Sequence, residues 1–171
     1  MPSQAIFQLQ NSSAVTIAAP VKQPTGTAIR TMLQIEAPST KSLTIVEWGI
    51  SFDAFAAALP VQVELLATTV AATMSTATVA ADIVQVNGPA DEASLITLGG
   101  TTHTGFATAT VTEGTVANAR MLDLQLVSPT NQYWKQFPLG REPIVPPSKF
   151  LRVRVTAGTT VNAYIYVVWG E

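Results

Sequence analysis

Alternation of apolar and polar residues at every second position recurs along most of the chain and constrains its fold more than any other feature. The alternating runs are rich in β-branched and aromatic residues and are separated by clusters of Pro, Gly, Asn and Ser. Successive side chains of a strand point to opposite faces of a sheet, so each run can place one apolar face on a core. Eight or more short strands of this kind predict an all-β fold, a jelly-roll-like antiparallel β-sandwich. The runs cover residues 5–10, 29–37, 42–53, 61–68, 106–114, 119–127, 150–157 and 161–169.

The length of 171 residues suits one domain with its own core. We expect residues 29–171 to form this single β-sandwich domain. Residues 1–28, which hold three prolines and the first predicted strand, are expected to form an extended N-terminal arm. Within the domain, residues 67–86 are predicted to be irregular or strand-like, because their Thr and Val content opposes a long helix.

Two local features of the predicted strands lead to sharper expectations. Residues 150–157 and 161–169 are predicted to form a hairpin in which Val155 pairs with Val161. This register places both apolar rows on one core, sets Arg152 opposite Tyr164 and keeps the arginines out of the core. In the strand at 42–53, Trp48 is expected in the core. The glycine after it predicts a β-bulge.

No arrangement of residues in the sequence points to catalysis. The chain has no cysteine, which excludes disulfides and thiolate chemistry, and His103 is its one histidine. We therefore expect no metal, no other cofactor and no enzymatic activity. Paired carboxylates can hydrolyse glycosides, but ion pairing or exposure to water explains the carboxylates on the predicted strands better. These carboxylates are Glu47, Asp53, Glu64 and Asp123.

The chain carries few charges for its size. Only 12% of its residues are charged and the formal net charge is −2, so it presents no basic field that would attract nucleic acid. A surface with so few charges is easier to explain if partners cover much of it, although a Thr-rich β protein can also stay soluble without charge. We find no signal peptide and no apolar run long enough to span a membrane, and therefore expect a soluble chain assembled in a cytoplasm.

The segment "PLGREPIVPPSKF" at residues 138–150 contains four prolines. Proline fixes φ and removes a backbone donor, so this segment cannot be an interior strand. A stiff segment loses little conformational entropy when it docks. Two interpretations remain open: a rigid connection across one end of the sandwich, and a strap that contacts a neighbouring subunit. The interface candidates in and beside this segment are Tyr133, Trp134, Phe137, Arg141 and Ile144.

Residues 31–53 and 121–171 resemble a group of small β-rich virion proteins of tailed bacteriophages, especially those that infect actinobacteria. The similarity lies in the "VEWGISFD" strand, the text "SPTNQY" at 128–133, "PLGREP" and the closing "NAY" strand. It covers most of residues 29–171 and is weaker in the N-terminal segment and in 67–100. The resemblance implies a structural protein without catalytic residues, either a capsid decoration (cement) protein or a minor head protein.

The expected function is therefore stabilisation of a phage head lattice. The expected partners are the major capsid protein and copies of the chain itself, with a homotrimer favoured and the N-terminal arm as a second contact. The expected location is the capsid surface of a virion assembled in the host cytoplasm. Two alternatives stay open: a tail structural subunit, and a carbohydrate-binding or host-adhesion module. The second would need exposed aromatic side chains, which Tyr133, Trp134, Tyr164 and Tyr166 could supply.

Overall fold

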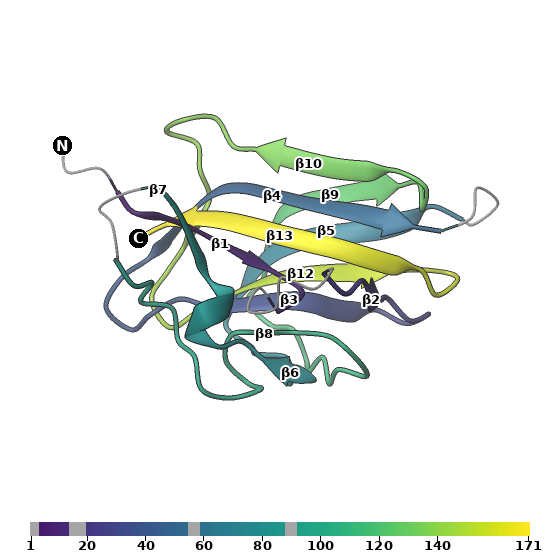
Figure 1. The fold of residues 1–171 in the computed structure, drawn as a ribbon, viewed down its shortest axis with the longest axis horizontal. Coiled ribbons are helices and arrows are strands. Elements are labelled where there is room, and N and C mark those ends of the chain that lie inside the picture. Colours follow the sequence, from purple (N-terminus) through teal and green to yellow (C-terminus); the bar gives the residue numbers. More distant parts are fainter. Residues whose placement is uncertain (1–3, 14–19, 55–58, 88–91) are drawn as a thin grey trace.

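The computed structural model describes residues 4–13, 20–54, 59–87 and 92–171, which form two antiparallel β-sheets packed face to face (Figure 1). Sheet A contains, in spatial order, β10 (Gln132–Gln136), β4 (Leu43–Asp53), β13 (Asn162–Gly170), β1 (Ile6–Gln10) and β7 (Val84–Asn87). Two short strands extend it: β11 (Ile144–Val145) pairs with β4, and β2 (Gln23–Pro24) pairs with β13.

Sheet B contains, in spatial order, β6 (Thr76–Ala77), β8 (Gly105–Phe106), β3 (Arg30–Glu36), β12 (Phe150–Thr156), β5 (Val61–Thr68) and β9 (Arg120–Val127). A single 3-10 turn, η1 (Ala80–Asp82), precedes β7 in the described residues. The predicted all-β sandwich is confirmed, and residues 67–86 contain no long helix, as predicted. The jelly-roll connectivity stays a prediction.

One continuous core fills the space between the sheets. It is built from the inward-facing residues of both sheets, which is the arrangement that period-2 alternation predicts. Trp48 of β4 and Trp169 of β13 are its largest members and are fully buried, which confirms the core position predicted for Trp48. Burial of one large apolar side chain contributes about 1.5–3 kcal/mol, so these inward rows hold the two sheets together.

The predicted hairpin between residues 150–157 and 161–169 is wrong. β12 lies between β3 and β5 in sheet B, whereas β13 lies between β4 and β1 in sheet A. The connection therefore crosses from one sheet to the other, a distance of about 10 Å. Thr25 holds the end of this connection at Val161. The Thr25 N–H donates to the Val161 carbonyl at 2.8 Å, and the Thr25 hydroxyl accepts from the Val161 N–H at 3.1 Å. Alternation alone could not distinguish a hairpin within one sheet from a connection between the two sheets. In both arrangements the apolar rows of residues 150–157 and 161–169 face the same core.

The outer face of β12 is also covered, so the expectation that its arginines stay out of the interior is wrong for Arg152. Its guanidinium is fully buried, and Nε and Nη2 donate to the Thr31 hydroxyl at 3.0 and 2.6 Å. Nη1 donates to the Val70 carbonyl at 3.3 Å, and Nη2 forms an ion pair with Glu113. Burial lowers the pKa of Arg152, while Glu113 opposes this shift. Two loops thus cross over sheet B and bring a carboxylate to the buried cation.

The first strand predicted in the N-terminal segment belongs to the sandwich. β1 pairs with both β13 and β7, and Phe7 and Leu9 are buried in the core. Beyond β1, the Asn11 amide donates to the Ala163 carbonyl at 3.1 Å and accepts from the Ile165 N–H at 2.8 Å. Residues 1–3 and 14–19 lie outside the described residues, and an arm there stays a prediction.

The proline-rich segment forms a rigid connection across one end of the sandwich, which was one of its two interpretations. It runs from β10 in sheet A to β12 in sheet B and contributes β11, which pairs with the start of β4. The Pro143 carbonyl accepts from the Ile45 N–H at 2.9 Å, and the Pro146 carbonyl accepts from the Lys149 N–H at 3.2 Å. Contact of this segment with a neighbouring subunit stays a prediction.

Candidate functional site

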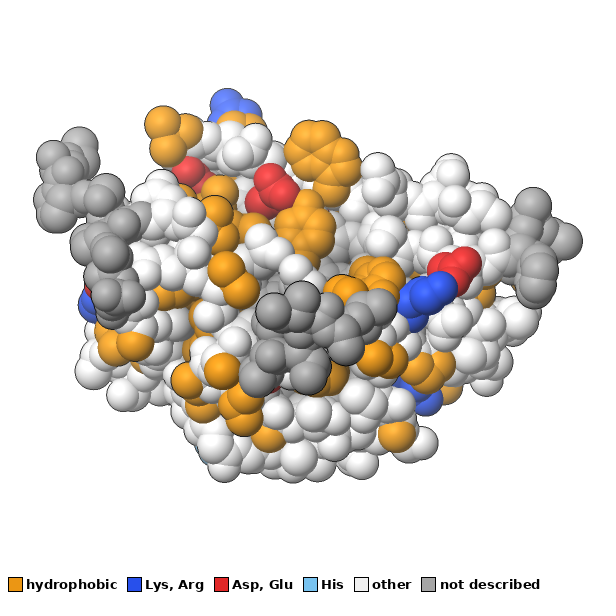
Figure 2. Space-filling view, viewed as in Figure 1, with side chains coloured by type: hydrophobic (Ala, Val, Ile, Leu, Met, Phe, Trp, Pro, Cys, Tyr) orange, Lys and Arg blue, Asp and Glu red, His pale blue; other side chains and the backbone are white. Residues whose placement is uncertain are grey.

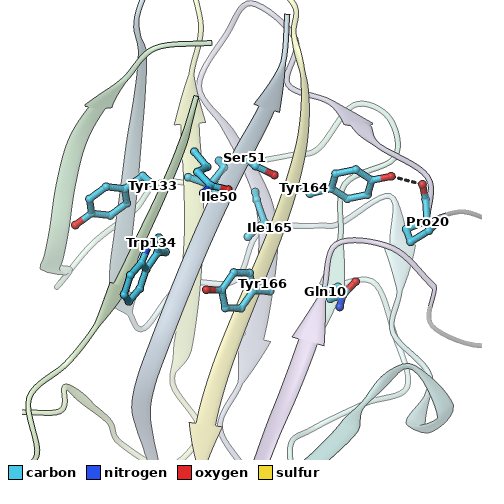
Figure 3. Close-up of a pocket in the computed structure, with 10 residues that line it drawn as sticks. Gln10, Pro20, Ile50, Ser51, Tyr133, Trp134, Tyr164, Ile165 and Tyr166 are labelled. Atoms are coloured by element: carbon cyan, nitrogen blue, oxygen red, sulfur yellow. Dashed lines mark hydrogen bonds between the residues drawn. The ribbon is translucent and has the colours of Figure 1, made fainter. Parts of the chain in front are cut away.

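The outer face of sheet A carries a groove of about 430 Å³ that runs across β10, β4, β13 and β1. Figure 2 shows hydrophobic side chains gathered over these strands, with few charged side chains among them. Figure 3 shows the Trp134 and Tyr166 rings on the two sides of β4, while Tyr164 lies beside Pro20. We call this site the aromatic groove. Its lining side chains on the outer face are Gln10, Ser51, Gln132, Trp134, Tyr164 and Tyr166.

Strand register creates the centre of the aromatic groove. Trp134 pairs with Gly49 on one side of β4, and Tyr166 pairs with the same glycine on the other side. The Tyr166 ring lies over Gly49, because a Cβ atom at this glycine would be only 2.4 Å from Cε1 of the ring. The bulge predicted at Gly49 is wrong: the irregularity in the β4–β13 register falls at Val46, and the glycine instead leaves room for the ring.

Both tyrosine rings of the aromatic groove are held by their hydroxyl groups. The Tyr166 hydroxyl donates to Oε1 of Glu47 at 2.5 Å, and the Tyr164 hydroxyl donates to the Pro20 carbonyl. Burial raises the pKa of the Tyr166 phenol, and the Glu47 carboxylate raises it further. Tyr166 therefore stays protonated at neutral pH and keeps its ring fixed across β4.

The polar side chains of the aromatic groove are uncharged. Gln10, Ser51 and Gln132 line it, and none of the three side chains forms a hydrogen bond to another described residue. No Lys or Arg is among the described residues that line the groove. The site thus combines aromatic rings with amide and hydroxyl groups that no other described residue engages, a combination suited to an uncharged polar ligand.

Tyr133 and Phe137 are interface candidates that the structure places at the edge of the core. The Tyr133 ring packs edge-on against Trp48, with ring centroids 5.5 Å apart, and its hydroxyl donates to Oδ2 of Asp123 at 2.8 Å. Burial and the Asp123 carboxylate raise the pKa of Tyr133 to about 12. Phe137 is 8% exposed. Trp134, on the alternate face of β10, is 59% exposed.

Asp123 links the end strands of the two sheets. This buried carboxylate on β9 accepts from Nε1 of Trp48 at 3.2 Å and from the Tyr133 hydroxyl, and Lys135 Nζ lies 3.3 Å from it. Burial alone would raise the pKa of Asp123, but hydrogen bonds from Gln125 and Tyr133 and the Lys135 charge outweigh it and lower the pKa. The network ties β9 to β4 and β10, and sequence reasoning gave no sign of it.

Large apolar side chains are exposed at this same edge of the sandwich. β9 and β10 are the end strands of sheets B and A, and they lie together at the top of Figure 1. The connection after β10 lies against β9, since Arg120 donates to the Ile144 carbonyl. The interface candidates Arg141 and Ile144 are both exposed in this connection. We call the exposed set the apolar edge: Met121, Leu124, Leu126, Leu139 and Ile144.

The residues considered for catalysis are held by separate partners. Glu64 pairs with Arg154 at 2.5 Å, Asp53 pairs with Lys22, and His103 Nδ1 lies 2.5 Å from Glu36. Glu47 and Asp123 are held by the tyrosines described above. Among the described residues, no three His, Asp or Glu side chains come together in a group that could hold a metal ion.

Among the described residues, no helix has both the length and the apolar character needed to cross a membrane. Comparisons with protein-family models, curated proteins and solved structures find no match to this chain.

Proposed function

We propose that the chain is a non-enzymatic structural protein of a bacteriophage virion, a capsid decoration protein that binds the major capsid protein through the apolar edge. The observation that carries the proposal is the exposure of large apolar side chains on β9, an end strand. Leu124 is 51% exposed and Leu126 is 73% exposed. The resemblance of residues 31–53 and 121–171 to phage virion proteins supports the same function.

An edge strand offers unpaired backbone groups to other chains, and proteins usually protect such strands with charges, prolines or a covering segment. Beyond its start, where the proline-rich connection lies against Arg120, β9 has little protection of this kind. Its one aspartate, Asp123, points into the sandwich, and Arg120 at its start is its remaining charged residue. Large apolar side chains exposed on an edge strand are typical of a surface that a partner protein covers.

The apolar edge is also rigid. The Asp123 network fixes β9 to β4 and β10, and the proline-rich connection holds Ile144 against the start of β4. A surface that is ordered before binding loses little conformational entropy on docking. A standard contact of about 1,600 Å² per copy, repeated over a lattice, would stabilise a shell without any single strong bond.

The test is co-sedimentation with capsids. The chain is produced together with the major capsid protein encoded in the same genome, and assembled particles are isolated on a density gradient. We expect the wild-type chain to sediment with the particles. The double variant Leu124→Ser/Leu126→Ser should show at least tenfold lower occupancy, and Arg141→Ala should show a smaller loss.

The matched control is Val84→Ser/Val86→Ser on β7. This strand lies at the opposite end of sheet A, and both valines are exposed to a similar degree. We expect the control variant to bind particles as the wild type does. Equal occupancy of the Leu124→Ser/Leu126→Ser variant and the wild type would contradict the proposal, as would failure of the wild-type chain to sediment with particles.

A further inference from the structure

We propose that the aromatic groove binds a neutral oligosaccharide. This inference goes beyond the proposed structural function and does not depend on it, because the groove lies on the outer face of sheet A and the leucines of the apolar edge lie on β9 of sheet B. Its volume of about 430 Å³ falls within the range of about 300–1,000 Å³ that is typical of small-ligand sites.

The aromatic rings provide platforms for sugar rings. A pyranose presents C–H groups on its faces, and their partial positive charge is attracted to the negative face of an aromatic ring. Tyr164 and Tyr166 are two residues apart on β13, about 7 Å, and Trp134 lies on β10, two strands from β13. Rings separated in this way suit a ligand with several linked rings rather than one flat molecule.

The polar side chains of the groove match the hydroxyl groups of a sugar. Gln10 and Gln132 each carry an amide that both donates and accepts, and Ser51 carries a hydroxyl. None of these groups is engaged by another described residue, so a ligand can bind them without breaking a contact among the described residues. Sugar hydroxyls also donate and accept, which lets each pairing satisfy both partners.

The charge of the groove argues against anionic ligands. The lining has no described cation, and the nearby carboxylate of Glu47 accepts from Tyr166. Nucleic acids and acidic sugars would bring negative charge to this site without a counter-ion from the protein. A neutral sugar brings no charge to the groove and needs no counter-ion there.

A proline-rich peptide is the strongest competing ligand, because such peptides dock in aromatic-lined grooves. Proline lacks a backbone N–H, so a proline tract offers mainly carbonyl acceptors. The amide oxygens of Gln10 and Gln132 would then gain no donor from the proline residues of the ligand. A sugar supplies both donors and acceptors, and for this reason the free side chains favour the sugar.

The groove is organised before ligand binds. The hydroxyl groups of Tyr164 and Tyr166 are held by Pro20 and Glu47, and the Tyr166 ring is seated over Gly49. Little side-chain ordering therefore accompanies binding. The proposed activity is binding alone, without a chemical step.

The test is an NMR titration that observes the indole N–H of Trp134. The indoles of Trp48 and Trp169 are buried and donate to Asp123 and Glu171, so they serve as internal controls. The probes are three neutral hexasaccharides: cellohexaose, chitohexaose and maltohexaose. The comparison probes are hexagalacturonate, which is acidic, and a peptide with the sequence of residues 138–149 of this chain. We expect at least one neutral hexasaccharide to shift the Trp134 signal, with a dissociation constant on the order of 1 mM or tighter.

Variants then assign the binding to the groove. Tyr164→Ala and Tyr166→Ala should each weaken binding about tenfold or more, and Gly49→Ala should do the same by displacing the Tyr166 ring. The matched control is Val84→Ser/Val86→Ser on β7, the strand beyond β1, where neither valine lines the groove. We expect its affinity for the sugar to be unchanged. Thermal unfolding confirms that each variant is folded at the titration temperature.

The outcomes separate this inference from the proposed function. The inference is overturned if no neutral hexasaccharide shifts the Trp134 signal, if hexagalacturonate binds as well as the neutral sugars, or if only the peptide binds. Leu124→Ser/Leu126→Ser should keep sugar binding, and Tyr164→Ala should keep capsid binding. Loss of one activity thus leaves the other open to measurement.

Discussion

Replacement of Asp123 by alanine should destabilise the protein by about 3 kcal/mol. The indole N–H of Trp48 is fully buried and would lose its acceptor, which costs about 1–3 kcal/mol. The variant also loses its bonds to Tyr133 and Lys135, but both of these side chains are partly exposed and can turn toward water. Asp123→Asn keeps one acceptor oxygen and should cost about half as much, since the neutral amide can still bond Trp48 or Tyr133.

Urea unfolding followed by tryptophan fluorescence measures this effect, with an unchanged m-value as evidence that the unfolded state is unaffected. The corresponding fall in Tm is about 6–12 °C, from about 2–4 °C per kcal/mol for a chain of this size. The control is Asp53→Asn, which alters an exposed pair with Lys22 and should change stability by less than about 0.5 kcal/mol. An Asp123→Ala loss no larger than that of the control would refute the assigned role of this carboxylate.

Three further predictions concern the other buried polar groups and pH. The stability from Asp123 should be complete above its unfolded-state pKa of about 3.9 and disappear as pH falls through the lower folded-state pKa, so wild type and Asp123→Asn should converge in urea unfolding at acid pH. Absorbance at about 295 nm, compared between wild type and Tyr133→Phe, should show that Tyr133 ionises near pH 12, and stability should fall as pH rises from about 10 toward that value. Glu113→Ala should cost about 3 kcal/mol in urea unfolding by leaving the buried Arg152 charge unpaired, and the double variant Glu113→Ala/Arg152→Met should cost less; a larger cost for the double variant would contradict this.

The alternation in the sequence was sufficient to predict strands and a sandwich, because it reports directly which residues face the core. It could not assign strands to sheets. β12 and β13 have matching apolar rows in either sheet, and only the three-dimensional path of the chain places them apart. The burial of Arg152 could not be predicted from the sequence either. It depends on loops that contribute Val70 and Glu113, which lie more than 35 positions away along the chain.

The aromatic residues of the candidate site could be named from the sequence, but their arrangement could not. β10 is not among the strands predicted from the sequence, so the opposite orientations of Tyr133 and Trp134 were not predicted. The row formed by Trp134, Gly49 and Tyr166 depends on the registers of β4 with two strands that are distant in sequence. No local pattern encodes such a register. The role of Gly49 as a seat for a tyrosine ring became visible only with that register.

The most direct test of the central claim is amide hydrogen exchange of this chain, free in solution and bound to capsids assembled from the major capsid protein. The account predicts slower exchange on binding in β9 and in residues 139–145, where the apolar edge lies. Exchange in β6 and β8, at the other end of sheet B, should be unchanged. Protection confined to β6, β8 or β7, with none in β9, would contradict the account.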